Sequence, residues 1–254
     1  KWYFLGNASD GAMKTGWQKI WGKWYYLGSA NDGAMKTGWQ QVYGKWYYLG
    51  SAEDGSMKTY WQQINGKWYF FGGADDGAMK TGWQKIWGKW YYLGSANDGA
   101  MKTGWQKING KWYYMETSTG VMKTGFFRDA NGGLYYSDGS GAMVGNPGWN
   151  VIGGKWYWMN SNGSIYTGWL SRPSGWYYLN ADGSMATGWA KVGNTWYYMN
   201  GSGAMQTGWV KTASGWYYLT GSGAMATGWY VVGGNWYYSN SDGTMLTGWV
   251  KVGN

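Results

Sequence analysis

The feature that most constrains this chain is an internal repeat. A Trp-Tyr-Tyr-like triplet recurs with a period of 22 residues up to Trp112 and of 20 residues from Trp156 onward. A second Trp of each intact unit precedes the triplet by seven residues, as Trp17 precedes Trp24. Repeats of this length are typical of solenoids, in which each unit stacks on its neighbours and no single central core forms.

Each unit has the pattern of one β-hairpin. In residues 61–70, Asn65-Gly66 lies between two aromatic-rich segments, and both residues tolerate a positive φ, which favours a two-residue hairpin turn. The predicted cross-strand pairs are Ile64 with Lys67, Gln63 with Trp68, and Trp61 with Phe70. Because side chains alternate along a strand, both Trp of a unit then share one face, and the middle residue of the triplet points to the other.

The connecting loops divide the chain. They contain Asp-Gly turn dipeptides, whose carboxylates are typical of turn chemistry, and they are two residues longer in the first half. Phe126 and Leu134 stand where a unit between the halves should have its two Trp. We expect an all-β solenoid of stacked β-hairpins, each contacting only its neighbours, with 22-residue repeats in 1–125, a degenerate junction in 126–148 and 20-residue repeats in 149–254.

Composition excludes several functions. The 254 residues include 48 Gly, 25 Trp and 25 Tyr but no His and no Cys. Disulfides, thiolate metal sites, the commonest metal ligand and the commonest general base are therefore missing. No acidic pair stands outside the turns. We expect no enzyme activity, no cofactor and no metal.

Net charge and hydropathy do not identify a binding partner. Net charge is +9, of which residues 1–125 carry +7 and residues 126–254 carry +2. The Lys side chains can serve simply to keep an aromatic-rich surface soluble, and nucleic-acid binding by stacking is a distant alternative. No apolar run approaches the roughly 20 residues of a membrane span. Lys1 and Trp2 already lie inside a repeat, so we expect a trimmed N-terminus or a fragment.

One repeat, residues 188–209, resembles the choline-binding repeats of pneumococcal and related Gram-positive surface proteins. It contains Gly188-Trp189, Trp196-Tyr197-Tyr198, Met205 and Gly208-Trp209. The resemblance covers the whole chain and is closest to members built almost wholly of repeats. It implies a left-handed superhelix of hairpins with choline between successive hairpins. It also implies a secreted protein bound non-covalently to choline or phosphocholine on teichoic or lipoteichoic acid, with host proteins or glycans as further partners in adhesion.

In that family each cage takes two Trp from one hairpin, an aromatic residue from the next and often a nearby Met. Here one cage would be Trp189 and Trp196 with Tyr218, near Met205. The second Tyr of the triplet is preferred because it shares a face with the Trp, and the first Tyr stays an open alternative. The expected choline-binding residues are Trp17, Trp24 and Tyr48; Trp39, Trp46 and Phe70; Trp61, Trp68 and Tyr92; Trp83, Trp90 and Tyr114; Trp105, Trp112 and Tyr136; Trp149, Trp156 and Tyr178; Trp169, Trp176 and Tyr198; Trp189, Trp196 and Tyr218; and Trp209, Trp216 and Tyr238.

Two other interpretations compete with choline. The Trp could be core alone, but a core would accept Leu, Ile or Val, and both Trp recur with almost no substitution. Glucan-binding repeats are the runner-up, yet they typically lack the second Trp and the Met before Thr-Gly-Trp. We expect no cage at the junction. We also expect the 20-residue half to bind choline better, because longer loops hinder access, so that Trp189→Ala weakens retention more than Trp90→Ala.

Overall fold

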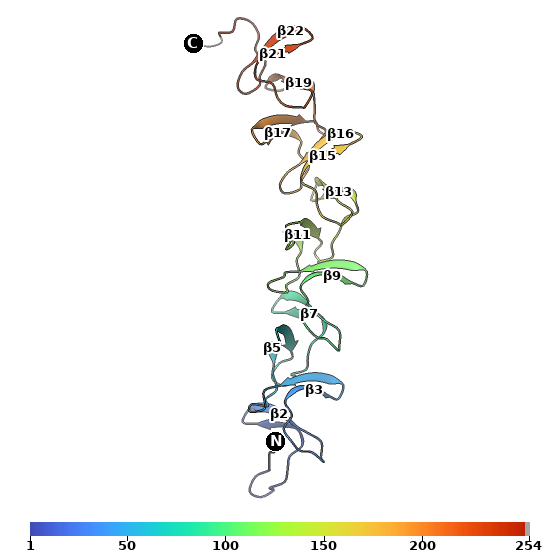
Figure 1. The fold of residues 1–254 in the computed structure, drawn as a ribbon, viewed down its shortest axis with the longest axis vertical. Helices are drawn as coiled ribbons and strands as arrows, with labels where there is room; N and C mark the ends of the chain where they lie inside the picture. The colour runs from blue at the N-terminus through green and yellow to red at the C-terminus, as the bar shows by residue number, and fades with distance from the viewer. Residues whose placement is uncertain (252–254) are drawn as a thin grey trace. The chain divides into compact units, whose positions relative to one another are not determined.

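The computed structural model describes residues 1–251 and contains only strands, turns and loops. Each strand pairs with the strand next to it in sequence, which gives eleven two-stranded sheets in the described residues (Figure 1). The hairpins fall into two compact units. Unit 1 contains residues 1–125 and 137–143, and unit 2 contains residues 126–136 and the described residues from Val144 onward. The all-β solenoid of stacked hairpins is confirmed within each unit.

The first five hairpins belong to unit 1. Their strands are β1 (Gly16–Ile20) and β2 (Lys23–Leu27), β3 (Gly38–Val42) and β4 (Lys45–Leu49), β5 (Tyr60–Ile64) and β6 (Lys67–Phe71), β7 (Gly82–Ile86) and β8 (Lys89–Leu93), and β9 (Gly104–Ile108) and β10 (Lys111–Met115). The next hairpin, at the degenerate repeat, consists of β11 (Gly125–Arg128) and β12 (Leu134–Ser137).

The last five hairpins belong to unit 2. Their strands are β13 (Gly148–Ile152) and β14 (Lys155–Met159), β15 (Gly168–Arg172) and β16 (Gly175–Leu179), β17 (Gly188–Val192) and β18 (Thr195–Met199), β19 (Gly208–Thr212) and β20 (Gly215–Leu219), and β21 (Gly228–Val232) and β22 (Asn235–Ser239).

The predicted register is confirmed. Trp61 pairs with Phe70, Gln63 with Trp68 and Ile64 with Lys67, and the turn residues Asn65 and Gly66 have φ of 49° and 78°. A two-residue turn with both φ values positive matches the right-handed twist of the flanking strands, which explains why Asn-Gly is found there.

Three turns of unit 1 have an aromatic residue where Asn65 stands. Trp21, Tyr43 and Trp87 have φ of 48°, 49° and 48°, in the left-handed region that L side chains rarely adopt. Their side chains are also solvent-exposed, at 93%, 90% and 74%. These rings therefore add strain to the turn and gain little burial in return.

The core is a series of small clusters at the strand ends. Leu49, Leu93 and Leu179, each the last residue of the second strand of its hairpin, are completely buried, and each forms a β-bridge to the Met of the following loop. That Met links hairpins, because its backbone N–H donates to the carbonyl of the second Trp of the preceding hairpin. The Met57–Trp24 and Met225–Trp196 bonds measure 2.7 and 2.8 Å.

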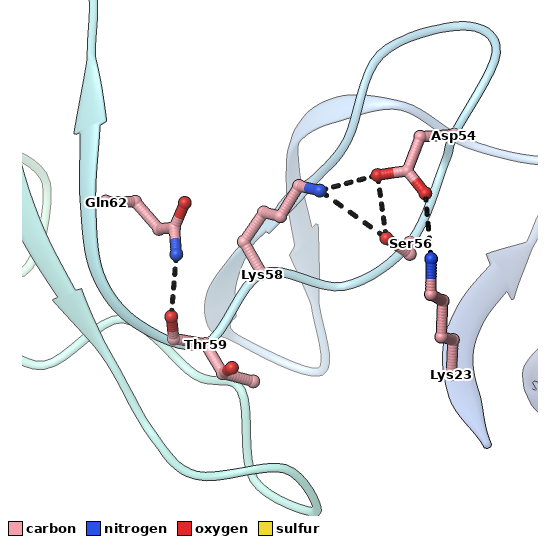
Figure 2. A network of polar contacts seen from close by, with 6 residues as sticks. All are labelled: Lys23, Asp54, Ser56, Lys58, Thr59 and Gln62. Carbon is pink, nitrogen blue, oxygen red and sulfur yellow. Dashed lines mark hydrogen bonds and ion pairs between the residues drawn. The ribbon is translucent and has the colours of Figure 1, made fainter.

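The loops of unit 1 are held by charge. Asp54 lies in the loop after β4, and Figure 2 shows it between Lys58 of the same loop and Lys23 on β2, at 2.5 and 3.8 Å. The Ser56 hydroxyl donates to the same carboxylate at 2.8 Å, and Gln62 at the start of the next hairpin donates to the Thr59 carbonyl at 2.8 Å.

The expectation that each hairpin contacts only its immediate neighbours is wrong. Asp75, in the loop after the third hairpin, lies 3.2 Å from Lys19 Nζ on the first hairpin. A hairpin thus contacts more than its immediate neighbours, because a connecting loop extends past the next hairpin. The shorter loops of unit 2 do the same, since Arg128 on β11 donates to the Ala181 carbonyl, in the loop after β16, at 3.2 Å.

Candidate functional site

The two Trp of each intact hairpin form two sides of a corner. Trp189 lies opposite Tyr198, and Trp196 lies opposite Lys191, so both indoles project from the same face. Their ring centroids are 6.5 Å apart and the ring planes are perpendicular, at 90°. The same near-perpendicular arrangement recurs in Trp39/Trp46, Trp61/Trp68, Trp83/Trp90, Trp105/Trp112, Trp149/Trp156, Trp169/Trp176, Trp209/Trp216 and Trp229/Trp236.

The third side comes from the next hairpin, from the first Tyr of its triplet. Tyr217 lies 4.7 Å from Trp189, ring centroid to ring centroid, and meets it edge to face. The same contact, between 4.7 and 5.1 Å, joins Trp17–Tyr47, Trp39–Tyr69, Trp61–Tyr91, Trp83–Tyr113, Trp149–Tyr177, Trp169–Tyr197 and Trp209–Tyr237. We call each group of two Trp and one Tyr an aromatic cage.

The second Tyr was preferred as the third residue, but in the structure it is the open alternative, the first Tyr, that meets the Trp of the preceding hairpin. Tyr218 lies 5.1 Å from Trp209 in its own hairpin instead of against Trp189. Strand alternation is the reason, since the second Tyr shares a face with its own Trp and the opposite face meets the preceding hairpin. The second aromatic residues Tyr48, Phe70, Tyr92, Tyr114, Tyr136, Tyr178, Tyr198, Tyr218 and Tyr238 all contact the first aromatic residue of their own hairpins.

The methionine at this cavity also differs from the expected Met205. A cavity of about 310 Å³ between Trp189 and Trp196 is lined by Met225, which follows the next hairpin, and Met205 is not among its lining residues. The backbone bond from Met225 to the Trp196 carbonyl explains this placement. A broader groove of about 630 Å³ in the same unit runs from Trp156 to Trp196 and includes Tyr178.

Two cages of unit 1 enclose comparable cavities. The cavity of about 440 Å³ is lined by Trp39, Trp46, Lys67, Tyr69, Met79, Asn97 and Asp98, and that of about 230 Å³ by Trp17, Trp24, Tyr47, Met57, Asp75 and Asp76. Burial raises the pKa of Tyr47 and of Tyr69, so both phenols stay neutral at physiological pH.

The sequence pattern did not place the acidic residues of these cavities among the expected site residues. It assigned the loop carboxylates to turns, and Asp242 does accept hydrogen bonds from the Thr244 backbone N–H in its own turn, at 2.8 Å. Asp242 nevertheless lines the Trp189/Trp196 cavity from a loop two hairpins further on, as Asp75 lines the Trp17/Trp24 cavity. No local sequence signal indicates contacts over such separations.

The Trp side chains of the cages are more exposed to solvent than the side chains of the core. The second Trp of most cages is 39–48% exposed, as in Trp68, Trp90, Trp112, Trp156, Trp176, Trp196 and Trp216. The aliphatic residues at the strand ends are completely buried. An aromatic ring whose only role is packing would be buried as they are, so the exposed indole faces are available to a ligand.

The degenerate hairpin packs without an open cage. Phe126 takes the place of the first Trp and contacts Tyr157 of the next hairpin at 5.1 Å. Leu134 replaces the second Trp and is buried with Tyr157, Met159 and Ile165, and Ile165 stands where the Met of other repeats stands. Small aliphatic side chains therefore fill the space that two indoles enclose elsewhere.

Between residues 1 and 251 there is no helix long and apolar enough to cross a membrane. Within that range, no group of three or more His, Cys, Asp or Glu is placed to hold a metal ion.

Comparisons with known proteins agree on one family. The sequence model of the choline-binding repeat matches residues 14–60, 58–103, 102–147, 147–187, 186–227 and 226–254. A comparison with curated protein sequences finds no match.

Solved structures from Streptococcus pneumoniae are similar over almost the whole chain. CbpJ is 33% identical with a TM-score of 0.67, covering 91% of this chain and 94% of its own. Choline binding protein F is 33% identical with a TM-score of 0.65, covering 91% and 92%. The autolysin LytC, at 24% identity and a TM-score of 0.52 over 88% of this chain and 52% of its own, shares the fold. With repeat matches along its length and these relatives, the chain belongs to the choline-binding repeat family.

Proposed function

We propose that the chain is a non-catalytic module that holds the choline or phosphocholine groups of teichoic or lipoteichoic acids and so attaches to the bacterial surface. The observation that carries the proposal is the half-exposed aromatic cage, with two perpendicular indoles, a Tyr from the next hairpin and a Met, as at Trp189, Trp196, Tyr217 and Met225. The proposal is supported by relatives whose names describe choline binding.

The chemistry of the cage suits a quaternary ammonium. Such a cation has no N–H, so hydrogen-bond acceptors cannot select it, whereas aromatic faces attract it by about 0.5–2 kcal/mol each. Three rings give a weak single site. Repetition along the chain raises retention on a polymer with many choline groups, because each additional contact forms at high effective concentration.

Titration calorimetry and tryptophan fluorescence with choline chloride test the cages directly. We expect heat and a fluorescence change that saturate at millimolar choline, and a smaller amplitude in Trp196→Ala. The matched control is Trp21→Ala, which removes an exposed Trp outside every cage and should leave the amplitude unchanged. No response at high choline would overturn the proposal.

Attachment is tested on purified cell walls. We expect the chain to bind choline-containing walls, to be released by free choline, and not to bind walls whose teichoic acid lacks choline. Release by an α-glucan instead of by choline would favour the runner-up, glucan binding. Sugar, peptide or phosphate set free from the walls by the carefully purified chain would contradict the absence of catalysis.

A further inference from the structure

The cage of Trp17 and Trp24 has a carboxylate at its rim. Asp75 Oδ1 accepts a hydrogen bond from the indole Nε1 of Trp24 at 3.3 Å and lies 3.2 Å from Lys19 Nζ. The same Nζ lies over the Trp24 ring, 5.7 Å from its centroid. An ammonium group that carries N–H bonds is thus held here by one aromatic face and one carboxylate together.

The neighbouring cage provides a natural comparison. Asn97 lines the cavity of Trp39 and Trp46 as Asp75 lines that of Trp17 and Trp24, and both residues stand immediately before the Asp-Gly of their loops. Trp24 Nε1 donates to Asp75, whereas Trp46 Nε1 is buried and has no hydrogen-bond partner in the structure. The two cages therefore differ at this rim position, which is charged in the first and neutral in the second. They differ also opposite the second Trp, where Lys19 pairs with Trp24 and Gln41 with Trp46.

Other carboxylates near these cavities are held by their own loops. Asp76 and Asp98 pair with Lys80 and Lys102 of the same loops. In unit 2, Asp242 accepts from the backbone N–H and the hydroxyl of Thr244. Asp75 alone among these four bonds directly to an indole that forms a cage. The Trp24 indole and Lys19 also keep the pKa of Asp75 below its ordinary value, so it is ionised at neutral pH.

We propose that Asp75 makes the Trp17/Trp24 cage selective for protonated amines that retain N–H bonds, such as ethanolamine, relative to quaternary ammonium ions. Such an amine can donate to Asp75 while the rings attract its charge. Choline gains the attraction of the charge but no hydrogen bond from its nitrogen, which has no hydrogen, and the hydroxyl is common to both molecules. The inference rests on the proposed function, since it takes the cages to be cation sites. Its ligand class is a primary ammonium, whether free or part of a wall polymer.

The test follows one indole at a time in the intact chain. Nuclear magnetic resonance of ¹⁵N-labelled indoles reports Trp24 and Trp46 separately, with signals assigned by Trp24→Phe and Trp46→Phe. Choline chloride and ethanolamine hydrochloride are titrated at equal ionic strength. The quantity compared is the ratio of the choline Kd to the ethanolamine Kd at each indole.

We expect this ratio at Trp24 to exceed that at Trp46 by on the order of five-fold, a modest factor because Asp75 is largely exposed. Asp75→Asn should reduce the Trp24 ratio to that of Trp46, and the reciprocal Asn97→Asp should raise the Trp46 ratio. Lys19→Met should increase ethanolamine affinity at Trp24, because the competing ammonium is gone. Both rim positions are solvent-accessible, so unchanged signals of the indoles outside these two cages verify the fold of the free variants.

The possible results distinguish the role of Asp75 from the proposed choline-binding function. Choline binding at both indoles with equal ratios, unaffected by Asp75→Asn, would overturn the role of Asp75 and leave the proposed function intact. Indoles that respond to neither cation would overturn the proposed function itself and the inference with it.

Discussion

Units 1 and 2 are built of the same hairpin but hold their loops by different means. In unit 1 an Asp and a Lys four residues apart form an ion pair in each of five loops, as Asp54 and Lys58 do. In unit 2 the shorter loops use Asn and Asp side chains that accept backbone N–H groups, as Asn162 and Asp182 do from Ser164 and Ser184. The cage geometry is the same in both, so it does not depend on the loop chemistry.

The units also differ at the rims of the cages. Trp196 and Trp216 of unit 2 are 39% and 43% exposed, whereas Trp24 and Trp46, next to long loops with acidic or amide residues, are less exposed. Trp90, also in unit 1, is 42% exposed. We therefore expect long loops to hinder the access of choline only at the first two cages of unit 1.

The largest change in stability is expected at the degenerate hairpin, where packed side chains occupy the place of a cage. Leu134→Ala should destabilise unit 2 by about 2–4 kcal/mol, because it leaves a cavity among Tyr157, Met159 and Ile165. The matched change is Trp156→Ala, at the equivalent position in the next hairpin, where the side chain is 47% exposed. Denaturant unfolding measures both. A larger loss for Trp156→Ala would mean that the exposed indole is the true packing residue.

The second comparison concerns choline retention. Trp196→Ala should weaken its site about tenfold, a loss of about 1.4 kcal/mol, as expected for one good cation–π contact and its packing. Trp24→Ala should reduce retention on a choline-like resin less, because its cage is more covered. An equal or greater loss in Trp24→Ala would refute hindrance by the loops. Trp189→Ala against Trp90→Ala tests the same preference between the halves as wholes.

A smaller change, an increase in stability, is expected at the hairpin turns of unit 1 that contain an aromatic residue. Trp21→Asn should stabilise unit 1 by about 0.5–1 kcal/mol, because Asn tolerates the positive φ that Trp21 adopts. The ring is 93% exposed, so little burial is lost. Thermal unfolding measures the change, with Asn65→Ala expected to destabilise as the reverse control. A destabilised Trp21→Asn would show that the exposed ring contributes to the fold.

The smallest difference is expected between the two kinds of loop. Asp54→Asn should destabilise by less than about 1 kcal/mol in low salt and by less still in high salt, because exposed ion pairs are weak and screened. Asp182→Asn should change little at any salt concentration, since Asn162 makes the same backbone contact in the preceding loop. Salt-dependent unfolding of the two variants makes the comparison. Equal salt dependence would remove the distinction between the loops.

Acid should weaken the contribution of Asp54 to stability. The Lys58 ammonium lowers the pKa of Asp54 below its ordinary value of 3.8. Its contribution is therefore present at neutral pH and is lost as the pH falls through that lowered pKa. Stability measured from pH 7 to pH 2 should fall less steeply in Asp54→Asn than in the unchanged chain. Identical profiles would mean that the ion pair adds nothing to folding.

The hairpins were predictable because their information is local. The turn Asn65-Gly66, the register of Trp61 with Phe70 and the shared face of the two Trp all follow from residues within one repeat. Strand alternation and the positive φ values of the turn are sufficient to derive them.

The third side of each cage depended on the tertiary structure. Whether Tyr217 or Tyr218 meets Trp189 depends on how one hairpin rotates against the next, which is set by contacts such as the bond from Met225 N–H to the Trp196 carbonyl. The Asp75–Trp24 bond joins residues 51 positions apart and exists only because the intervening hairpins stack. Sequence by itself determined the repeating element and the two indoles that it presents. Packing between elements decided what completes each cage, because contacts between hairpins leave no periodic signal within one repeat.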